Sequence, residues 1–444
     1  MAPRLTAALA ATALVAAVAL LVPATGAPSP AASPASEEAA RLLGAPPSHP
    51  LVFVPGLTSS NLTFTVLEAS EACPKLYKDA VLYPPPTAPA ATDPFWKCWA
   101  YALRTTFDAT TGTFHSEPGI QVDTVDYPRF IGNGLYIAQP YWEDAGYVVN
   151  KTLFCASFDW RMPSAGLEPY FAQLKSTVEQ ASALSGGVAV DLAAVSFGPQ
   201  IALSFLHRMT AAWKKQYIRW FVAESPVWSG SPTAALALTS GYTAPGAPPS
   251  FASFTHFVAV AADSLLWLLP RAGSGPNAWN DTEVIIETPN RNYTASGMTT
   301  LLTDLGYPHR VKAVEAIAKD ADLAKFDAPG VDTFVVYGTE LDTISKCSYN
   351  VTFKPDPSVL PPLPASYTMD PATGDGLVNR RSSERSLVEW PQAQKASGHK
   401  LYHKAYPKQQ HAACCLPSPS GQFCFIEVIA LLKEGKIPAG VVGN

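Results

Sequence analysis

The sequence predicts an α/β fold built on a largely parallel sheet, and two features of its patterning carry that prediction. Short apolar runs at residues 51–54, 188–195, 218–223 and 331–337 have the length and composition of strands buried on both faces. Segments with helical periodicity lie between them, at residues 167–184 and from 199 to about 212. Buried strands that alternate with helices are typical of a parallel sheet covered by helices.

Composition is consistent with this fold and excludes some function classes. The chain of 444 residues is 48% hydrophobic and 15% charged, which is enough to bury a large core. Its net charge is −5 and it has no basic run, so we do not expect nucleic acid as a partner.

The first 27 residues are typical of a signal peptide. Arg4 supplies a positive charge, residues 5–22 are apolar, and small residues follow at 23–27. An uncleaved anchor is the alternative, because the apolar run approaches the length that spans a bilayer. Residues 28–48, rich in Ala, Pro and Ser, are expected to be a disordered leader.

The remaining chain divides where the alternation of strands and helices breaks. We expect residues 49–228 to form the first part of the core, with a loop at 73–98, and residues 331–444 to form the second part. Residues 229–330 then form a cap insertion, and residues 345–370 also lie outside the alternation. The apolar stretch 256–270 is too short to span a bilayer, so it is interpreted as a cap helix or a lipid-facing surface.

Ser196 is the candidate nucleophile. The sequence Ala-Val-Ser-Phe-Gly at 194–198 follows a buried strand and precedes a helix, which is the setting of the nucleophile elbow of α/β-hydrolases. Small residues flank such a serine because the chain passes close to a strained turn, and the helix N-terminus favours negative charge. The alternative is an ordinary serine cap at a helix start. The strand before it and the helix after it favour the elbow.

A serine nucleophile needs an acid and then a histidine later in the chain. His411 lies after the strand-like residues 400–406 and before a final helix at 425–433, where such a histidine is expected. His403 lies inside the strand and is the weaker candidate. Asp375, between two glycines, is the preferred acid, and Asp342 is the alternative.

Two backbone amides are candidates for the oxyanion hole. The N–H of Phe197, which follows the nucleophile, is the first. The N–H of Leu57, in the loop after the first strand, is the second. No His or Cys cluster has the spacing of metal ligands, so neither a metal nor a cofactor is expected.

These landmarks, in their order along residues 51–433, resemble the lecithin:cholesterol acyltransferase family, which includes lysosomal phospholipase A and plant relatives. Val-Pro-Gly at 54–56 resembles its opening strand, and residues 194–198 are similar to its A-H-S-M-G elbow. Residues 374–378 are similar to its G-D-G-T-V, and residues 336–339 to its Y-G-T-G. The chain departs from the family where Val195 replaces a histidine and where Glu224 and Ser225 interrupt a G-A-P-W-G-G run.

The resemblance implies an α/β-hydrolase fold with a cap and a cysteine-bracketed lid or membrane-contact loop. It implies a serine-dependent lipid acyl hydrolase or acyltransferase, of the phospholipase A or phospholipid:sterol or diacylglycerol O-acyltransferase type, acting through an acyl-enzyme. The substrate would be a phospholipid or another acyl lipid at a membrane or lipid-particle surface. The alternatives are a catalytically silent lipid-binding homologue and an esterase for non-lipid acyl groups.

The resemblance also implies a disulfide between Cys73 and Cys98. The apolar loop that it closes, with Phe95 and Trp96, could insert into lipid, and the alternative is a purely structural bridge around a Pro-rich loop. Cys155 is expected to be a buried free thiol. We expect Cys347 to be bonded to one member of the C-terminal cluster, which consists of Cys414, Cys415 and Cys424, and one further bridge to form within that cluster. Because Cys414 and Cys415 are adjacent, a bridge between those two is disfavoured.

Five N-x-S/T sequons, together with the leader, predict a glycoprotein of the secretory pathway, either extracellular or in a lysosome-like or vacuole-like lumen. The candidate acceptors are Asn61, Asn150, Asn280, Asn292 and Asn350.

Overall fold

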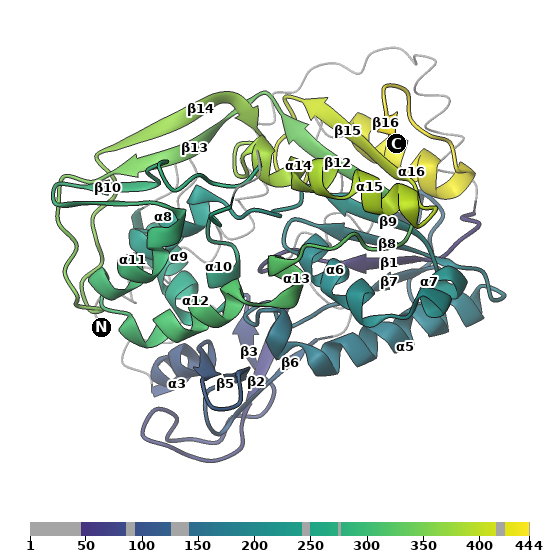
Figure 1. The fold of residues 1–444 in the computed structure, drawn as a ribbon. Coiled ribbons are helices and arrows are strands. Elements are labelled where there is room, and N and C mark those ends of the chain that lie inside the picture. The colour runs from purple at the N-terminus through teal and green to yellow at the C-terminus, as the bar shows by residue number, and fades with distance from the viewer. Residues whose placement is uncertain are drawn as a thin grey trace, which may run out of the picture.

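A computed structural model describes residues 46–85, 94–125, 142–241, 249–273, 277–413 and 422–443. Its centre is a seven-stranded sheet with the strand order β16-β15-β12-β9-β8-β1-β7 (Figure 1). Neighbouring strands pair in parallel, except β16, which is antiparallel to β15. The strands are β1 (Leu51–Val54), β7 (Leu153–Cys155), β8 (Val190–Val195), β9 (Ile218–Glu224), β12 (Thr333–Thr339), β15 (Leu401–Pro407) and β16 (Val442–Gly443).

Both faces of this sheet are buried, as the apolar strands require. On one face pack α5 (Glu168–Leu184), α6 (Gly198–Arg208) and the α14–α15 pair (Arg380–Glu389, Pro391–Ala396). On the other face packs α16 (Gln422–Glu434), together with residues 142–147. The chain therefore has the α/β-hydrolase architecture that its sequence predicted, with the loops at the carboxyl ends of β1, β8, β9, β12 and β15 gathered on one edge.

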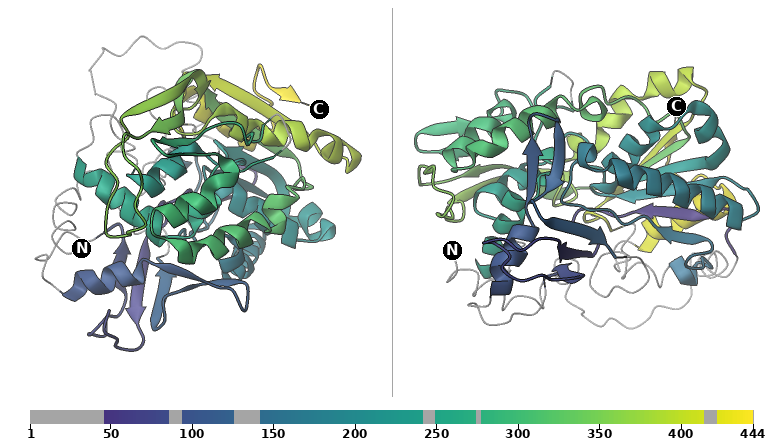
Figure 2. Two further views of the ribbon diagram at one scale, coloured as in Figure 1. Left: turned by 60° about the vertical axis from the view of Figure 1, so that its left-hand side comes forward. Right: turned by 90° about the horizontal axis from the view of Figure 1, so that it is seen from below.

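A small subdomain lies at one end of the molecule (Figures 1 and 2). It contains the sheet β3-β2-β6 and the hairpin β4–β5. Its elements are β2 (Leu62–Val66), β3 (Ala80–Tyr83), α3 (Pro94–Ala102), β4 (Thr105–Asp108), β5 (Thr113–Ser116) and β6 (Ile120–Thr124). A disulfide joins Cys73 to Cys98 and ties α3 to the loop after β2.

The chain between β9 and β12 forms a helical layer beside the sheet. It contains α8 (Pro232–Thr239), α9 (Pro249–Ala261), α10 (Ser264–Trp267), α11 (Met298–Asp304), α12 (Val311–Ala318) and α13 (Ala321–Ala324). Its strands β10 (Ile286–Thr288) and β11 (Arg291–Tyr293) join the hairpin of β13 (Leu341–Ser348) and β14 (Ser366–Gly374) in one four-stranded sheet. Residues 229–330 and 345–370, which did not fit the alternation of strands and helices in the sequence, thus pair with each other through β10 and β13.

Two apolar segments were considered as lipid-facing surfaces. Of the two alternatives for residues 256–270, the structure favours helix, because they are divided between α9 and α10, and Leu265, Leu266 and Trp267 are buried in the core rather than facing lipid. Trp96 of the disulfide-linked segment is only 3% exposed and packs against Trp99, so this ring is not available to a membrane. Within the described ranges, no helix has the length and apolarity needed to cross a bilayer.

Candidate active site

Ser196 lies on the tight turn between β8 and α6, with a positive φ of 61°. This is a strained conformation for a serine, and such strain is characteristic of nucleophile elbows. Its amide donates to the carbonyl of Glu224, at 2.9 Å, at the end of the neighbouring strand β9. The turn therefore holds the hydroxyl at the carboxyl edge of the sheet, next to the N-terminus of α6.

Two glycines permit the close approach of the first loop to this turn. A Cβ on Gly198 would lie 2.5 Å from the carbonyl oxygen of Val54 and 2.7 Å from that of Pro55. A Cβ on Gly56 would lie 3.1 Å from Cβ and 3.6 Å from Oγ of Ser196. The loop after β1 thus passes directly against the serine, which explains why small residues flank it.

His411 bridges Ser196 and Asp375. Its Nε2 lies 2.8 Å from Oγ of Ser196, and its Nδ1 lies 2.7 Å from Oδ2 of Asp375. The three side chains come from the loops after β8, β14 and β15, so the fold brings together residues that are up to 215 positions apart. A hydroxyl, an imidazole and a carboxylate in this order form the arrangement that activates serine for acyl transfer.

The carboxylate of Asp375 is held by its own loop. Its Oδ1 accepts hydrogen bonds from the amides of Leu377, at 3.1 Å, and Val378, at 2.8 Å. Its backbone carbonyl accepts from the amide of His411 at 3.0 Å. These bonds leave Oδ2 directed to the imidazole.

Gly338, at the end of β12, leaves room for both loops that carry the acid and the base. A Cβ at this position would lie 2.1 Å from the carbonyl oxygen of Gln409 and 3.0 Å from Cβ of Asp375. Any larger residue here would therefore separate Asp375 from the loop of His411.

The alternative candidates lie elsewhere. Asp342 caps the amide of Ala372 at 3.0 Å on the β13–β14 hairpin. His403 lies within β15, paired in register with Val335 of β12. The structure places neither in the hydrogen-bonded chain of Ser196, His411 and Asp375.

The electrostatics around His411 favour its charged form. Burial lowers the pKa of His411, but the Asp375 carboxylate and, less strongly, Glu224 act against it, so the pKa is raised above the ordinary histidine value. The same charges therefore stabilise an imidazolium at this position.

Glu224 and Ser225 are site residues whose role the sequence did not reveal. Glu224 is 1% exposed at the end of β9, and its charge acts on both His411 and Tyr406. Oγ of Ser225 accepts from the amide of Ala412, next to His411, at 3.3 Å. In the sequence, the one feature that distinguished Glu224 was its charge at the carboxyl end of a buried strand, at a place where the family that the chain resembles has an apolar run.

The loop after β1 has a defined orientation at Leu57. The hydroxyls of Thr58 and Ser59 donate to the Leu57 carbonyl at 2.7 and 3.3 Å, and Thr58 has a φ of 57°. A Cβ on Gly56 would lie 3.1 Å from Cβ of Ser196, so Leu57 follows directly on the point where this loop approaches the serine. The described residues contain no cluster of three or more potential metal ligands.

Three of the cysteine predictions have structural outcomes. The disulfide between Cys73 and Cys98 is present. The expected bond of Cys347 to the C-terminal cysteines is wrong, because Cys347, on β13, is a free thiol buried in the core. Cys155 keeps a thiol 3.6 Å from Oγ of Ser157, but it is partly exposed rather than buried.

The C-terminal cysteines are only partly described. Cys424 is disulfide-bonded, and Cys414 and Cys415 lie outside the described residues.

The sequons differ in exposure. Asn150, Asn280, Asn292 and Asn350 are exposed. Asn61 is only 6% exposed, whereas a glycan acceptor is normally a surface residue. Exposure therefore argues against Asn61 as an acceptor.

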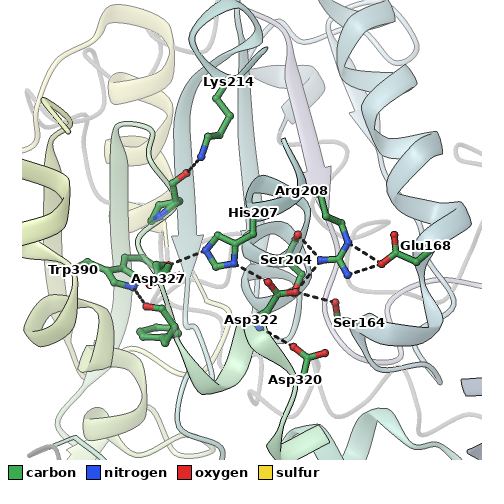
Figure 3. A network of polar contacts seen from close by, with 12 residues as sticks. Ser164, Glu168, Ser204, His207, Arg208, Lys214, Asp320, Asp322, Asp327 and Trp390 are labelled. Atoms are coloured by element: carbon green, nitrogen blue, oxygen red, sulfur yellow. Dashed lines mark hydrogen bonds and ion pairs between the residues drawn. The ribbon is translucent and has the colours of Figure 1, made fainter. Parts of the chain in front are cut away.

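A polar network joins the elbow helix to the layer between β9 and β12 (Figure 3). Asp322 of α13 accepts from His207 Nδ1 and Arg208 Nη1, both at 2.8 Å, near the end of α6. Arg208 also pairs with Glu168 of α5 at 2.6 Å. Burial raises the pKa of Asp322, but its bonds to His207 and Arg208 dominate and lower it to about 2. The network therefore anchors α13 to the helix that follows the nucleophile.

Comparisons with known proteins identify a family. A family model described as Lecithin:cholesterol acyltransferase matches residues 87–325. The lysosomal phospholipase A and acyltransferase of Bos taurus is 29% identical over 301 residues, which cover 64% of this chain and 69% of that protein. The phosphatidylcholine-sterol acyltransferase of Mus musculus is 28% identical over 298 residues, which cover 65% of this chain and 64% of that protein.

Among solved structures, the chain is similar to one titled "The crystal structure of Tle4-Tli4 complex", with 11% identity and a TM-score of 0.45 over 87% of this chain and 99% of that chain. The family model covers more than half of the sequence, so the chain belongs to the lecithin:cholesterol acyltransferase family.

Proposed function

We propose that the protein is a serine-dependent lipid acyl hydrolase or acyltransferase in which Ser196, His411 and Asp375 are the catalytic triad. The observation that carries the proposal is the hydrogen-bonded chain from Ser196 Oγ through His411 to Asp375, at 2.8 and 2.7 Å, on a serine with positive φ. Membership of a family whose curated members are named as phospholipases and sterol acyltransferases supports a lipid ester as substrate.

The first half-reaction follows from the positions of these groups. His411 Nε2 accepts the Ser196 proton as Oγ bonds to the ester carbonyl carbon, and Asp375 stabilises the imidazolium. The amides of Leu57 and Phe197 donate to the oxyanion of the tetrahedral intermediate. The intermediate then expels the lipid alkoxide, which takes the proton from His411 and leaves the acyl group on Ser196.

In the second half-reaction an acceptor hydroxyl gives its proton to His411 and attacks the acyl-enzyme. Water as acceptor yields a fatty acid, and a lipid alcohol yields a new ester. Both outcomes regenerate Ser196 with its proton, so one site serves hydrolysis and transfer.

Contact with a lipid surface is proposed for the disulfide-linked subdomain. Its exposed apolar side chains are Leu67, Leu76 and Val81, which are 63%, 68% and 46% exposed. Apolar residues exposed together at one end of a protein favour interfacial binding. A secretory-pathway location is supported by this disulfide, the leader and the four exposed sequons.

A fluorophosphonate probe tests the nucleophile. We expect the wild-type chain and Ser345→Ala to be labelled, and Ser196→Ala to be unlabelled. Ser345 is a matched control because its hydroxyl donates to the carbonyl of Thr368 across the β13–β14 hairpin and takes no part in the hydrogen-bonded chain of Ser196, His411 and Asp375. Absence of labelling in the wild type would instead support a catalytically silent lipid-binding protein.

Liposomes distinguish the two reactions once the nucleophile is established. Phosphatidylcholine vesicles with and without a sterol or diacylglycerol are incubated with the enzyme, and free fatty acid and new ester are quantified. Product that is exclusively fatty acid in all vesicles identifies a hydrolase, and ester formed at the expense of fatty acid identifies a transferase.

A further inference from the structure

The loop that carries Leu57 connects the central sheet to the disulfide-linked subdomain. It runs from the end of β1 at Val54 to the start of β2 at Leu62, so the proposed oxyanion donor lies on the chain that joins these two parts. Thr58, the next residue, has a φ of 57°, in the left-handed region that a β-branched residue rarely adopts. Such a conformation persists only where the surrounding structure holds it. The contacts of Thr58 therefore set the path of this loop.

Tyr83 lies against the loop from the side of the subdomain. It ends β3 and pairs in register with Leu62, the first residue of β2. The residue is 4% exposed, and its ring packs edge-on against Trp160, with centroids 4.9 Å apart. Burial raises the pKa of Tyr83 to about 12, and a hydrogen bond with the side chain of Thr58 acts in the opposite direction. The phenol therefore keeps its proton at neutral pH and contacts Thr58.

The direction of this hydrogen bond follows from the single proton of the Thr58 hydroxyl. Oγ1 of Thr58 donates that proton to the carbonyl of Leu57 at 2.7 Å. Since a hydroxyl has one proton and two lone pairs, Thr58 then accepts from the phenol of Tyr83. Two hydrogen bonds in series thus connect Tyr83 to the backbone of Leu57, the residue whose amide is the proposed oxyanion donor.

Trp160 holds the same loop two residues further along. Its Nε1 donates to the carbonyl of Ser60 at 3.1 Å, and Oγ of Ser60 accepts from the amide of Phe158 at 3.1 Å. Trp160 is fully buried, and Ser60 is 1% exposed. The ring that packs against Tyr83 therefore also binds the loop, which is held at Thr58 and at Ser60 by groups that lie outside the triad.

The end of β3 is in turn held by the helix of the disulfide. Nε1 of Trp99 donates to the carbonyl of Leu82, the residue before Tyr83, at 2.9 Å. Trp99 follows Cys98, which is bonded to Cys73. Tyr83 is therefore anchored in the subdomain while its hydroxyl contacts the loop.

We propose that Tyr83 is a positioning residue, which acts through Thr58 to hold the backbone of Leu57 in the geometry that the oxyanion requires. This inference rests on the proposed function, because it gives Tyr83 a role in the reaction of Ser196. Preorganised donors act on the transition state more than on the bound substrate. A displaced amide therefore lowers kcat and leaves KM nearly unchanged.

Removal of one hydroxyl tests this role. Tyr83→Phe keeps the ring against Trp160 and removes the donor. Tyr101→Phe is the matched control, because its hydroxyl donates to the carbonyl of Pro118, at 3.3 Å, in the same subdomain. On a soluble short-chain p-nitrophenyl ester we expect Tyr83→Phe to lower kcat about tenfold, with KM within about twofold of wild type, and Tyr101→Phe to change neither. A raised KM with unchanged kcat, or no loss at all, would overturn the proposal.

A double-mutant cycle tests the route through Thr58. Thr58→Ala should lower kcat by a similar factor, and Thr58→Ser, which keeps a hydroxyl, should recover most of that loss. Tyr83→Phe combined with Thr58→Ala should be no slower than Thr58→Ala alone, because residues on one hydrogen-bonded chain are not additive. Losses that multiply in the double variant would show that Tyr83 acts elsewhere and would contradict the proposal. If Tyr83→Phe does not fold, equal activity of Thr58→Ala and Thr58→Ser would overturn it instead.

Inhibition by an alkyl trifluoromethyl ketone separates positioning from a purely structural role. The ketone forms a hemiketal with the serine, and the oxyanion of that hemiketal needs the same amides, so its Ki should weaken in Tyr83→Phe by the factor that kcat/KM loses. A lower kcat with an unchanged Ki would refute the role of Tyr83. Fluorophosphonate labelling of the wild type reports the triad independently. An unlabelled and inactive wild type refutes the proposed function, whereas a labelled wild type together with a fully active Tyr83→Phe refutes this inference alone.

Discussion

Replacing Gly198 by alanine should separate the loop after β1 from the nucleophile. The added Cβ would lie 2.5 and 2.7 Å from the carbonyl oxygens of Val54 and Pro55, and both are backbone atoms that cannot rotate away. Relief to an ordinary contact moves the loop by roughly 1 Å, and a displacement of that size can cost about 100-fold in rate. The moved loop carries Leu57, whose amide is the proposed second oxyanion donor. Loss of one such donor costs about 100- to 1,000-fold in kcat.

The same clash costs stability, so activity and folding must be measured together. Overpacking of this kind destabilises by about 1–3 kcal/mol, which leaves a chain of this size folded at room temperature. The assay is kcat/KM on a short-chain p-nitrophenyl ester, with the melting temperature measured in parallel. Gly297→Ala is the matched control, because its Cβ would meet nothing closer than 3.7 Å and its φ is −82°. A folded Gly198→Ala enzyme with kcat/KM within threefold of wild type would refute this account of the elbow.

Three other predictions concern charge and the disulfide. Because the pKa of His411 is raised and catalysis needs the neutral imidazole, the acid limb of kcat/KM should have its midpoint above the ordinary histidine value. Glu224→Gln should move that limb to lower pH, while Glu71→Gln, whose side chain is 98% exposed, should not; an unmoved limb would contradict the role of Glu224. The pKa of Asp322 is lower in the folded chain than its ordinary value of 3.8, so its carboxylate stabilises the fold at pH values above 3.8. Asp322→Asn should therefore lower the free energy of unfolding by about 2 kcal/mol at pH 7. That difference should shrink as the pH falls from 3.8 towards 2. A difference that is the same at pH 7 and pH 2.5 in denaturant titrations would argue against this contribution. Replacing both Cys73 and Cys98 by serine opens a bridge between residues 25 positions apart and should cost about 3 kcal/mol, so an unchanged melting temperature would show that the bridge does not stabilise this subdomain.

The central sheet was predictable because its strands have a local signature. Residues 51–54 became β1 with the predicted bounds, and the strands expected at 188–195, 218–223 and 331–337 appear within two residues of those bounds. The helix expected at 167–184 is α5, Glu168–Leu184. Apolar runs flanked by helical periodicity leave few other arrangements, since parallel strands need helices as crossovers.

Pairings between distant segments were not predictable in the same way. The partner of β13 is β10, which lies in the other segment that broke the alternation, and no local pattern encodes that choice. Cys347 falls on β13 opposite Tyr367, and its strand pairing buries it as a thiol, whereas counting cysteines suggested a bridge. The sequence shows that a side chain is apolar or reactive, and the register of a strand decides which neighbours it meets.

The site illustrates the same division between local and distant information. The triad residues could be proposed because each lies in a recognisable local setting: Ser196 after a buried strand, Asp375 between glycines, and His411 before the last helix. Glu224 could not, because its meaning depends on which strands lie beside β9. Only when β8 and β12 are its neighbours do Glu224 and Ser225 come to lie against both the nucleophile turn and the histidine loop. A carboxylate that interrupts an apolar family motif is then best explained by the charge on His411, which it stabilises, and the shift of the acid limb in Glu224→Gln measures that contribution directly.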